Sequence, residues 1–271
     1  MSEKPVQRKA SDEAVFRRQG PIEVITLNRP KAMNAFTLNM LRLLTRRLDE
    51  LKQDDEMRAV VVTGSGRGFC GGADLSGQGL RGDAQTPVGT RLSVDVYSHA
   101  VKALTELEKP VIGAINGAVV GAGCSFALAC DFLIACEEAR FILLFVRRGL
   151  VADTGGTFFL PRLVGLARAK ELMFTGDEVG AHRALELGLV NRVVPHEKLM
   201  DEAMELASGL AGGPTRAIGM IKRMLNRSFQ SDLDTALEFE AAFQGIAVST
   251  EDAREGIASF LEKRRPEFKG R

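Results

Sequence analysis

The chain has 271 residues, of which 45% are hydrophobic and 26% charged, a usage typical of a soluble enzyme with a sizeable core. Lys and Arg number 36 against 35 Asp and Glu, and this balance excludes a strong electrostatic field for nucleic acid or an anionic membrane. No apolar stretch approaches the roughly 18 residues of a membrane span, so we expect neither nucleic acid nor membrane among its partners.

The amino-terminal residues 1–12 are mostly polar and lack the apolar core of a targeting signal, so we expect a flexible tail there. Four cysteines occur without CxxC spacing; they are Cys70, Cys124, Cys130 and Cys136. The last three have apolar neighbours, as small buried side chains do, which favours a reducing compartment. We therefore expect a cytoplasmic protein.

The first predicted element is a β-hairpin, because β-prone residues at 15–16 and 24–27 flank the turn signal Gly20-Pro21. A helix follows, since apolar residues recur at the spacing of one helix face; they are Leu41, Leu44, Leu48 and Leu51. Residues 59–63 form a continuous apolar run, which predicts a strand buried on both faces. The polar, Gly-rich segment 64–90 predicts a long loop that lines a site or is mobile. The sequence does not decide whether its part 77–90 closes over a ligand.

The rest of the chain repeats the order of strand, turn and helix and then turns helical. A helix is predicted from about Val94 to Glu108, then a strand at 111–115, a helix ending at Asp131, and strands at 132–135 and 141–146. Helical segments follow near 168–174, 179–187, 197–211, 214–229, 233–243 and 251–263. These units predict an α/β fold, with a core at 13–195 and a helical C-terminal region at 196–271.

Two patterns imitate known sites but lack the surroundings that those sites need, and the histidines form no pattern. Residues 66–71 match G-x-G-x-x-G, but a polar loop follows in place of the helix that dinucleotide binding needs. The three histidines have no metal-ligand spacing, so we expect no metal. Ser125, Asp153 and His182 follow the chain order of a hydrolase triad, but the second glycine of a nucleophile elbow is missing. A small residue that packs a helix on a strand is therefore the favoured interpretation of Ser125.

Two turns of small residues, at 70–75 and 117–124, each follow a predicted strand. Small residues let a ligand approach the backbone closely. If one N–H group from each turn converges, the pair makes an oxyanion hole, in which one donor is worth about 3 kcal/mol of transition-state stabilisation. Close packing of a helix on a strand needs glycine equally, so the spacing alone leaves both interpretations open.

Asp153 stands at the end of an apolar run, directly before a threonine and a glycine pair. Within 110–170 the other acids are Asp131, Glu137 and Glu138. The position suits a helix N-cap, because Asp is a favoured capping residue. It also suits a general base, since apolar neighbours such as Phe145 and Ala152 raise the pKa of a carboxyl group.

From about Val15 to Phe268 the chain resembles the crotonase superfamily of enoyl-CoA hydratases and isomerases. The landmarks, in chain order, are 27–35 (LNRPKAMNA), 69–75 (FCGGADL), 109–117 (KPVIGAING), 121–131 (GAGCSFALACD), 155–165 (GGTFFLPRLVG), 175–176 (TG) and 188–195 (GLVNRVVP). The resemblance implies a crotonase spiral of ββα units with a C-terminal helical trimerisation region. It also implies an acyl-CoA thioester as substrate and a homotrimer or a dimer of trimers.

Roles for individual residues follow from the same resemblance. The N–H groups of Ala73 and Ala122 would bind the thioester oxygen as it becomes an enolate. The residues that match the family's CoA-binding pattern are Lys31, Ala32, Ala35, Asp74 and Leu75, with Phe260 and Lys263 as the C-terminal contribution. Without the resemblance, Lys263 would be interpreted as an exposed helical lysine. No separate cofactor is implied, because coenzyme A is part of the substrate.

Two departures from the family pattern bear on the reaction. Family hydratases carry glutamates where this chain has Ser125 and Phe145. Water addition needs one group to activate water and another to manage the α-proton, each worth about 10²–10⁴-fold in rate, so efficient hydration is not expected. Phe145 suggests a pocket wall for an apolar or aromatic acyl group, although an ordinary core phenylalanine is an equal alternative.

Asp153 matches an aspartate used by dienoyl-CoA isomerases, epoxyphenylacetyl-CoA isomerases and aryl-CoA dehalogenases. We therefore expect Asp153 to move a proton between two carbons of the acyl chain in a 1,3 shift. The alternatives are a hydratase of low efficiency, a dehalogenase-like hydrolase and a catalytically silent acyl-CoA-binding paralogue. A dehalogenase also needs a histidine, and His99 is one residue from the family's position, which turns it by about 100° on a helix.

Overall fold

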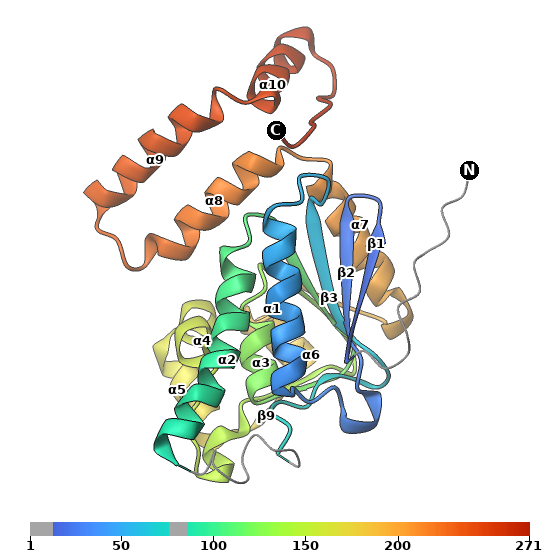
Figure 1. Ribbon diagram of the computed structural model, residues 1–271, viewed down its shortest axis with the longest axis vertical. Coiled ribbons are helices and arrows are strands. Elements are labelled where there is room, and N and C mark those ends of the chain that lie inside the picture. The colour runs from blue at the N-terminus through green and yellow to red at the C-terminus, as the bar shows by residue number, and fades with distance from the viewer. Residues whose placement is uncertain (1–12, 76–85) are drawn as a thin grey trace.

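The computed structural model describes residues 13–75 and 86–271 (Figure 1). The predicted tail at 1–12 lies outside the described residues, as does 76–85 of the predicted loop. The architecture is mixed α/β, as predicted, with a six-stranded sheet, a four-stranded sheet and helices around both.

The larger sheet has the strand order β1-β2-β3-β5-β7-β10 and is parallel except for the β1–β2 hairpin. Its strands are β1 Ala14–Gln19, β2 Ile22–Leu27, β3 Ala59–Gly64, β5 Val111–Ile115, β7 Phe132–Cys136 and β10 Arg192–Val194. Every residue of β5 is buried, and so is every residue of β3 except Gly64. The predicted opening hairpin and the central buried strand are confirmed.

The smaller sheet consists of four short strands, of which only β8 overlaps a predicted strand. It contains β4 Gly68–Cys70, β6 Ala118–Val120, β8 Arg140–Ile142 and β9 Glu178–Gly180. β4 and β6 fall in segments predicted as loop or turn, because three residues are too few for a periodic pattern. The predicted strand at 141–146 is wrong beyond Ile142, since η3 Leu144–Arg148 is a 3-10 helix that the left-handed Gly149 ends.

The helices differ from the predictions mainly at their ends. They are η1 Pro30–Ala32, α1 Leu38–Lys52, α2 Pro87–Glu106, α3 Ala122–Ala127, α4 Gly156–Val164, α5 Leu166–Thr175, α6 Ala181–Glu186, η4 His196–Lys198, α7 Leu199–Ala211, α8 Thr215–Ser228, α9 Leu233–Ala247 and α10 Glu251–Glu262. The start of α2 precedes Val94, because the Thr86 hydroxyl caps the helix and Pro87 suits its first position. α3 ends before Asp131. α4 was missed because it starts at a glycine and contains Pro161.

α7 packs across β2, β3, β5 and β7, whereas α8, α9 and α10 extend away from the sheets (Figure 1). The structure confirms the helical C-terminal third, and the boundary at 195/196 stays a prediction. α9 buries no residue at all. Large apolar side chains on these three helices are exposed: Ile221, Leu225, Leu233, Leu237, Ile246, Ile257, Phe260 and Leu261. Within the described ranges, no helix has the length and apolar character to cross a membrane.

A buried ion pair fastens α8 to the core. Lys222 is 8% exposed, and its Nζ donates to Asp131 Oδ2 at 2.7 Å and to the carbonyl oxygens of Lys109 and Leu104 at 3.1 and 3.3 Å. Such a pair is costly to break, because the remaining charge loses its counter-ion.

We expect Lys222→Met to lower the free energy of unfolding by about 3–5 kcal/mol, since the half-buried Asp131 would lose its cation. Urea denaturation followed by circular dichroism measures the change. Arg216→Met is the matched control, because it breaks an exposed pair with Asp55 that is worth about 1 kcal/mol or less. Equal losses for the two variants would contradict the anchoring role of Lys222.

Candidate active site

The two predicted turns of small residues lie against each other, because β4 and β6 are parallel neighbours. A Cβ atom on Gly72 would lie 2.8 Å from Val120 O and 3.6 Å from Ala122 N. A Cβ atom on Gly123 would lie 2.6 Å from Cys70 Sγ. Only glycine permits so close an approach, so the glycines bring the Ala73 and Ala122 segments together.

The amides of Ala73 and Ala122 are available as donors. Phe36 pairs with the backbone on both sides of Ala73: its N–H donates to Gly72 O at 2.7 Å, and its carbonyl accepts from Asp74 N at 2.9 Å. Ala122 is the first residue of α3, where a helix leaves its N–H groups unsatisfied. Neither amide has a hydrogen-bond acceptor among the residues that the structure describes.

Asp153 occupies a strained turn between η3 and α4. Thr154 and Gly155 both have positive φ, 55° and 80°, and reverse the chain directly after Asp153. The α4 N-cap is Gly155, and no side chain caps this helix. The N-cap interpretation of Asp153 is therefore wrong, and its carboxylate bonds instead to the Thr154 hydroxyl at 2.9 Å.

Burial raises the pKa of Asp153 above its ordinary value, and the Thr154 hydroxyl partly opposes this shift. The direction agrees with the prediction of an apolar surrounding. A carboxylate whose pKa is raised holds a proton more readily and is a better base near neutral pH.

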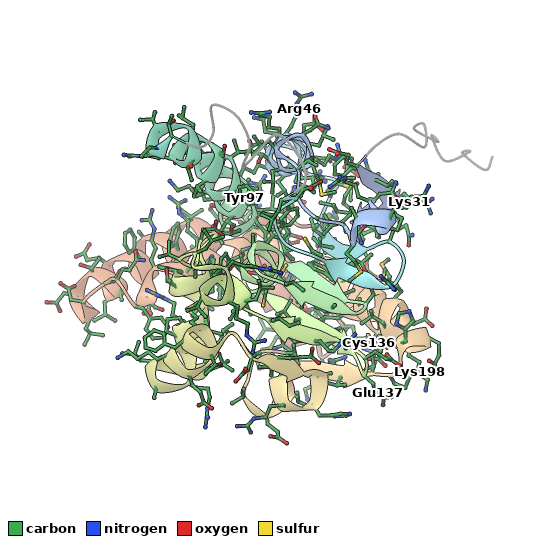
Figure 2. All side chains as sticks on the ribbon, turned by 90° about the horizontal axis from the view of Figure 1, so that it is seen from below. Lys31, Arg46, Tyr97, Cys136, Glu137 and Lys198 are labelled. Atoms are coloured by element: carbon green, nitrogen blue, oxygen red, sulfur yellow. The ribbon has the colours of Figure 1, made fainter. Side chains whose placement is uncertain are left out.

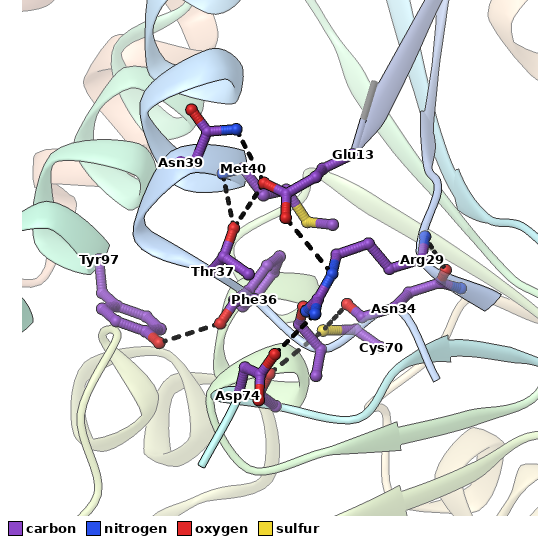
Figure 3. A network of polar contacts seen from close by, with 12 residues as sticks. Glu13, Arg29, Asn34, Phe36, Thr37, Asn39, Met40, Cys70, Asp74 and Tyr97 are labelled. Atoms are coloured by element: carbon purple, nitrogen blue, oxygen red, sulfur yellow. Dashed lines mark hydrogen bonds and ion pairs between the residues drawn. The ribbon is translucent and has the colours of Figure 1, made fainter. Parts of the chain in front are cut away.

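Tyr97, the single tyrosine of the chain, is a site residue that the sequence analysis missed. It is 9% exposed on α2, and its hydroxyl donates to Phe36 O at 3.4 Å, the same carbonyl that accepts from Asp74 (Figure 3). Burial raises the pKa of Tyr97, and the charge of nearby Asp153 raises it further. Tyr97 thus stays protonated between Asp153 and the oxyanion-hole segment. The sequence predicted a helix over this segment but could not indicate what lies across from Tyr97.

Two of the predicted CoA-binding residues, Asp74 and Ala35, are hydrogen-bonded to Arg29, and Figure 3 shows the contact between Arg29 and Asp74. Its guanidinium donates to Asp74 Oδ2 at 2.7 Å and to Ala35 O at 2.6 Å, and lies 3.4 Å from Glu13 Oε1. The Asp74 carboxylate therefore ties the 71–75 turn to the 29–35 loop. The other predicted residues differ in exposure. Ala32 in η1 is half-buried and Ala35 is buried, whereas Lys31 and Leu75 are exposed.

Phe260 and Lys263 lie apart from the rest of the predicted site. Phe260 is on α10 and 82% exposed, and Lys263 follows as the left-handed C-cap. Figure 1 places α10 at the opposite end of the molecule from α3 and α4. Within one chain these two residues do not meet Asp153. Phe145 is half-buried in η3 and packs against the core, so both interpretations of this residue remain open.

The remaining candidates of the sequence analysis have structural explanations. Ser125 is fully buried, and a Cβ atom on Gly156 would lie 2.5 Å from its hydroxyl, so Ser125 packs α3 against α4. His182 is exposed on α6 and cannot serve Ser125. His99 lines a groove with the α1 residues Arg42 and Arg46, on a different face of α2 from Tyr97.

One group of potential metal ligands exists in the described part of the chain. The ligand atoms of Cys136, Glu138 and His196 lie within 4.8 Å of one another. Figure 2 shows Cys136 well apart from Tyr97, so the group is separate from the Asp153 site. The sequence did not reveal it, because the β7–β10 pairing brings His196 near Cys136. That the protein uses no metal stays a prediction.

Comparison with known proteins places the site in context. Residues 17–271 match the sequence model of the family described as enoyl-CoA hydratase/isomerase. The 1,2-epoxyphenylacetyl-CoA isomerase of Escherichia coli (strain K12) is 40% identical over 92% of this chain and 95% of its own length. The short-chain-enoyl-CoA hydratase of Clostridium acetobutylicum is 38% identical over 96% of this chain and 99% of its own.

Solved structures agree with the sequence comparisons. The crystal structure of enoyl-CoA hydratase from Bacillus anthracis aligns with a TM-score of 0.90 and 35% identity, over 96% of this chain and all of that one. An enoyl-CoA hydratase from Mycobacterium smegmatis aligns with a TM-score of 0.89 and 33% identity, over 95% and 99% of the two chains. The predicted crotonase fold is confirmed.

Proposed function

Since this chain belongs to the enoyl-CoA hydratase/isomerase family, we propose that it is an acyl-CoA isomerase that works through an enolate intermediate. The observation that carries the proposal is the half-buried carboxylate of Asp153, whose pKa is raised by burial. The two positions where family hydratases carry glutamates hold Ser125 and Phe145 instead. One base without a second acid suits movement of a proton better than addition of water.

The proposed reaction conserves every atom of the substrate. Asp153 removes a proton from one carbon of the acyl chain, and the electron pair of the broken C–H bond moves into the thioester, giving an enolate. The N–H groups of Ala73 and Ala122 bind the negative oxygen, as backbone donors do in oxyanion holes. Asp153 then returns the proton to a second carbon two positions away. The double bond has moved, and the enzyme is unchanged.

The packing of Ser125 also disfavours hydration. Its hydroxyl is fully buried against Gly156, and in the described residues it has no hydrogen-bond partner. A longer side chain at 125 would run into the α4 backbone, so the space that a glutamate needs is filled. Hydration remains the second candidate, because several relatives carry hydratase names. Asp153 would then have to activate water alone.

Coenzyme A recognition is proposed for the segment around Lys31, Ala32, Ala35, Asp74 and Leu75. Arg29 holds the two halves of this segment together through Asp74 and Ala35. Lys31 extends from η1 at the rim of the molecule, where Figure 2 labels it, and a cation there suits phosphate groups.

The exposed apolar residues of α8, α9 and α10 support a homo-oligomer, a trimer or a dimer of trimers. A patch of this size seldom stays uncovered in a monomer. Assembly would also allow Phe260 and Lys263 of one copy to reach the coenzyme A segment of another, which they cannot do within one chain.

We expect Leu237→Lys to dissociate the assembly and raise the KM for acyl-CoA, because it places a charge on the exposed apolar face of α9. Light scattering after size exclusion should give a multiple of 29.4 kDa for the wild type and a smaller mass for the variant. Ser208→Lys on α7, an exposed residue outside this face, is the control and should keep the wild-type mass. An unchanged mass for Leu237→Lys would remove this face from the interface.

A substrate panel tests the proposed reaction. Purified protein is incubated with 3-enoyl-, 2-enoyl-, dienoyl- and arylacetyl-CoA esters, and the products are separated by mass and by double-bond position. Isomerisation leaves the mass unchanged, whereas hydration adds the mass of water. A hydrated product that forms faster than any isomer would contradict the proposal.

A further inference from the structure

The backbone conformation of Thr154 is unfavourable for a β-branched residue. Its φ is 55°, in the left-handed region, and threonine is β-branched, a combination that is rare and strained. The residue is 3% exposed, so its surroundings fix it in place. Glycine would relieve the strain at this position, as it does at the next one, Gly155. Strain of this kind persists at functional sites where the geometry is needed.

The strained backbone places the Thr154 hydroxyl on the neighbouring carboxylate. Its Oγ1 donates to Asp153 Oδ1 at 2.9 Å. Apart from the backbone N–H of Asp153 itself, no other group within the described ranges hydrogen-bonds to this carboxylate, and no other residue bonds to Oδ2. One carboxylate oxygen is thus anchored, and the other is left for a proton.

We infer that Thr154 is a positioning residue, whose hydroxyl orients Asp153 through Oδ1 so that Oδ2 takes and returns the proton. The inference rests on the proposed function of Asp153. It explains why threonine stands where the backbone favours glycine. A single anchored oxygen also keeps both proton transfers on one face of the acyl chain, as a 1,3 shift requires.

The groups around Asp153 leave Thr154 as its main polar partner. Burial is the largest influence on its pKa and raises it, whereas the Thr154 hydroxyl and, to a smaller extent, the backbone N–H of Asp153 lower it. The titratable group that faces Asp153 from α2 is Tyr97, which stays neutral because its pKa is raised. Val101, one turn later on the same helix, faces Gly155 and carries no charge: a Cβ atom on Gly155 would lie 3.5 Å from its Cγ1. Among residues 13–75 and 86–271, no lysine or arginine contributes to the shift of Asp153.

Three substitutions separate the hydroxyl from the backbone strain. Thr154→Val keeps the shape and the β-branch but removes the donor, Thr154→Ser keeps the donor without the β-branch, and Thr154→Gly removes both. The measurement is the pH dependence of kcat/KM, whose acidic limb reports the ionisation of Asp153 in the free enzyme.

We expect Thr154→Val and Thr154→Gly to shift the acidic limb upward by about one pH unit, because the ionised carboxylate loses a donor. At neutral pH, kcat should fall about tenfold with little change in KM, since the coenzyme A segment is untouched. Thr154→Ser should match the wild type in both respects. Thermal melts test whether each variant is folded. If Thr154→Val does not fold, Thr154→Gly still measures the loss of the hydroxyl.

Wild-type profiles for both Thr154→Val and Thr154→Gly would overturn the inference, provided that Asp153→Asn is inactive. A shifted limb for Thr154→Ser as well would also overturn it, because the hydroxyl would then not be the cause. If Asp153→Asn itself turns over at the wild-type rate, the proposed function fails instead. The two failures are therefore distinguishable.

Discussion

Asp153→Asn is expected to lower kcat for isomerisation by about 10²–10⁴-fold, because the substitution removes the proposed general base. The amide has nearly the same shape, and its oxygen can still accept the bond from the Thr154 hydroxyl. Binding of a non-reactive acyl-CoA, measured by calorimetry, should therefore stay near the wild-type value. A loss of kcat without a loss of binding identifies a group that acts in the chemical step.

Asp201→Asn provides the control for this experiment. Asp201 lies exposed in the first turn of α7, and its loss should leave kcat and binding unchanged. An Asp153→Asn variant with the wild-type rate would assign the base to another residue.

The same substitution should also stabilise the protein at neutral pH. Burial raises the pKa of Asp153 in the folded state, so the folded protein binds this proton more tightly than the unfolded chain. The ionised form then destabilises the fold, and the penalty develops as the pH rises from the ordinary pKa of aspartate through the raised one. Melting temperatures of wild type and Asp153→Asn should therefore differ more at pH 7 than near pH 4. A wild type that is more stable than the variant at pH 7 would contradict the raised pKa.

Gly72→Ala is expected to lower kcat by about 10²–10³-fold, the loss that follows from misplacing one oxyanion donor. The new Cβ atom would lie 2.8 Å from Val120 O, and both this oxygen and Gly72 belong to the backbone. The contact can therefore be relieved only if one of the two backbone segments moves. The φ of 90° at Gly72 adds strain for any residue but glycine. The Ala73 and Ala122 segments must therefore separate. An overpacked contact of this kind also lowers the free energy of unfolding by about 1–3 kcal/mol.

Gly209→Ala is the matched control for Gly72→Ala. Gly209 lies in the exposed part of α7, where a Cβ atom meets nothing within 4 Å. Alanine there should keep kcat and stabilise the helix by up to about 1 kcal/mol. If Gly72→Ala keeps the wild-type kcat, the two turns do not form the oxyanion hole.

The α/β order and most of the helices could be predicted, because strong periodic patterns carry that information. The apolar run at 59–63 and the leucines of α1 are examples, and both are buried as expected. The short strands β4 and β6 could not be predicted, because their pairing depends on residues about 50 positions apart. These strands nevertheless bring the two glycine turns together.

The candidate site, too, could be predicted only in part from the sequence. Asp153 stood out in the sequence as an isolated acid, but the choice between helix cap and base needed the φ values of Thr154 and Gly155, which put the helix start beyond it. Tyr97 carried no signal of its own, since its role depends on a contact with Phe36 O. The separation of Phe260 from Asp153 is a property of the tertiary fold and does not follow from any local pattern.

Isotope labelling in H₂¹⁸O and D₂O tests the central claim, that one carboxylate moves a proton and does not add water. The wild-type protein is incubated with a 3-enoyl-CoA in each solvent, and the products are analysed by mass spectrometry. We predict a shifted double bond, no ¹⁸O in the isomer, and deuterium only at the two carbons between which the proton moves. A 3-hydroxyacyl-CoA that carries ¹⁸O as the main initial product would contradict the account.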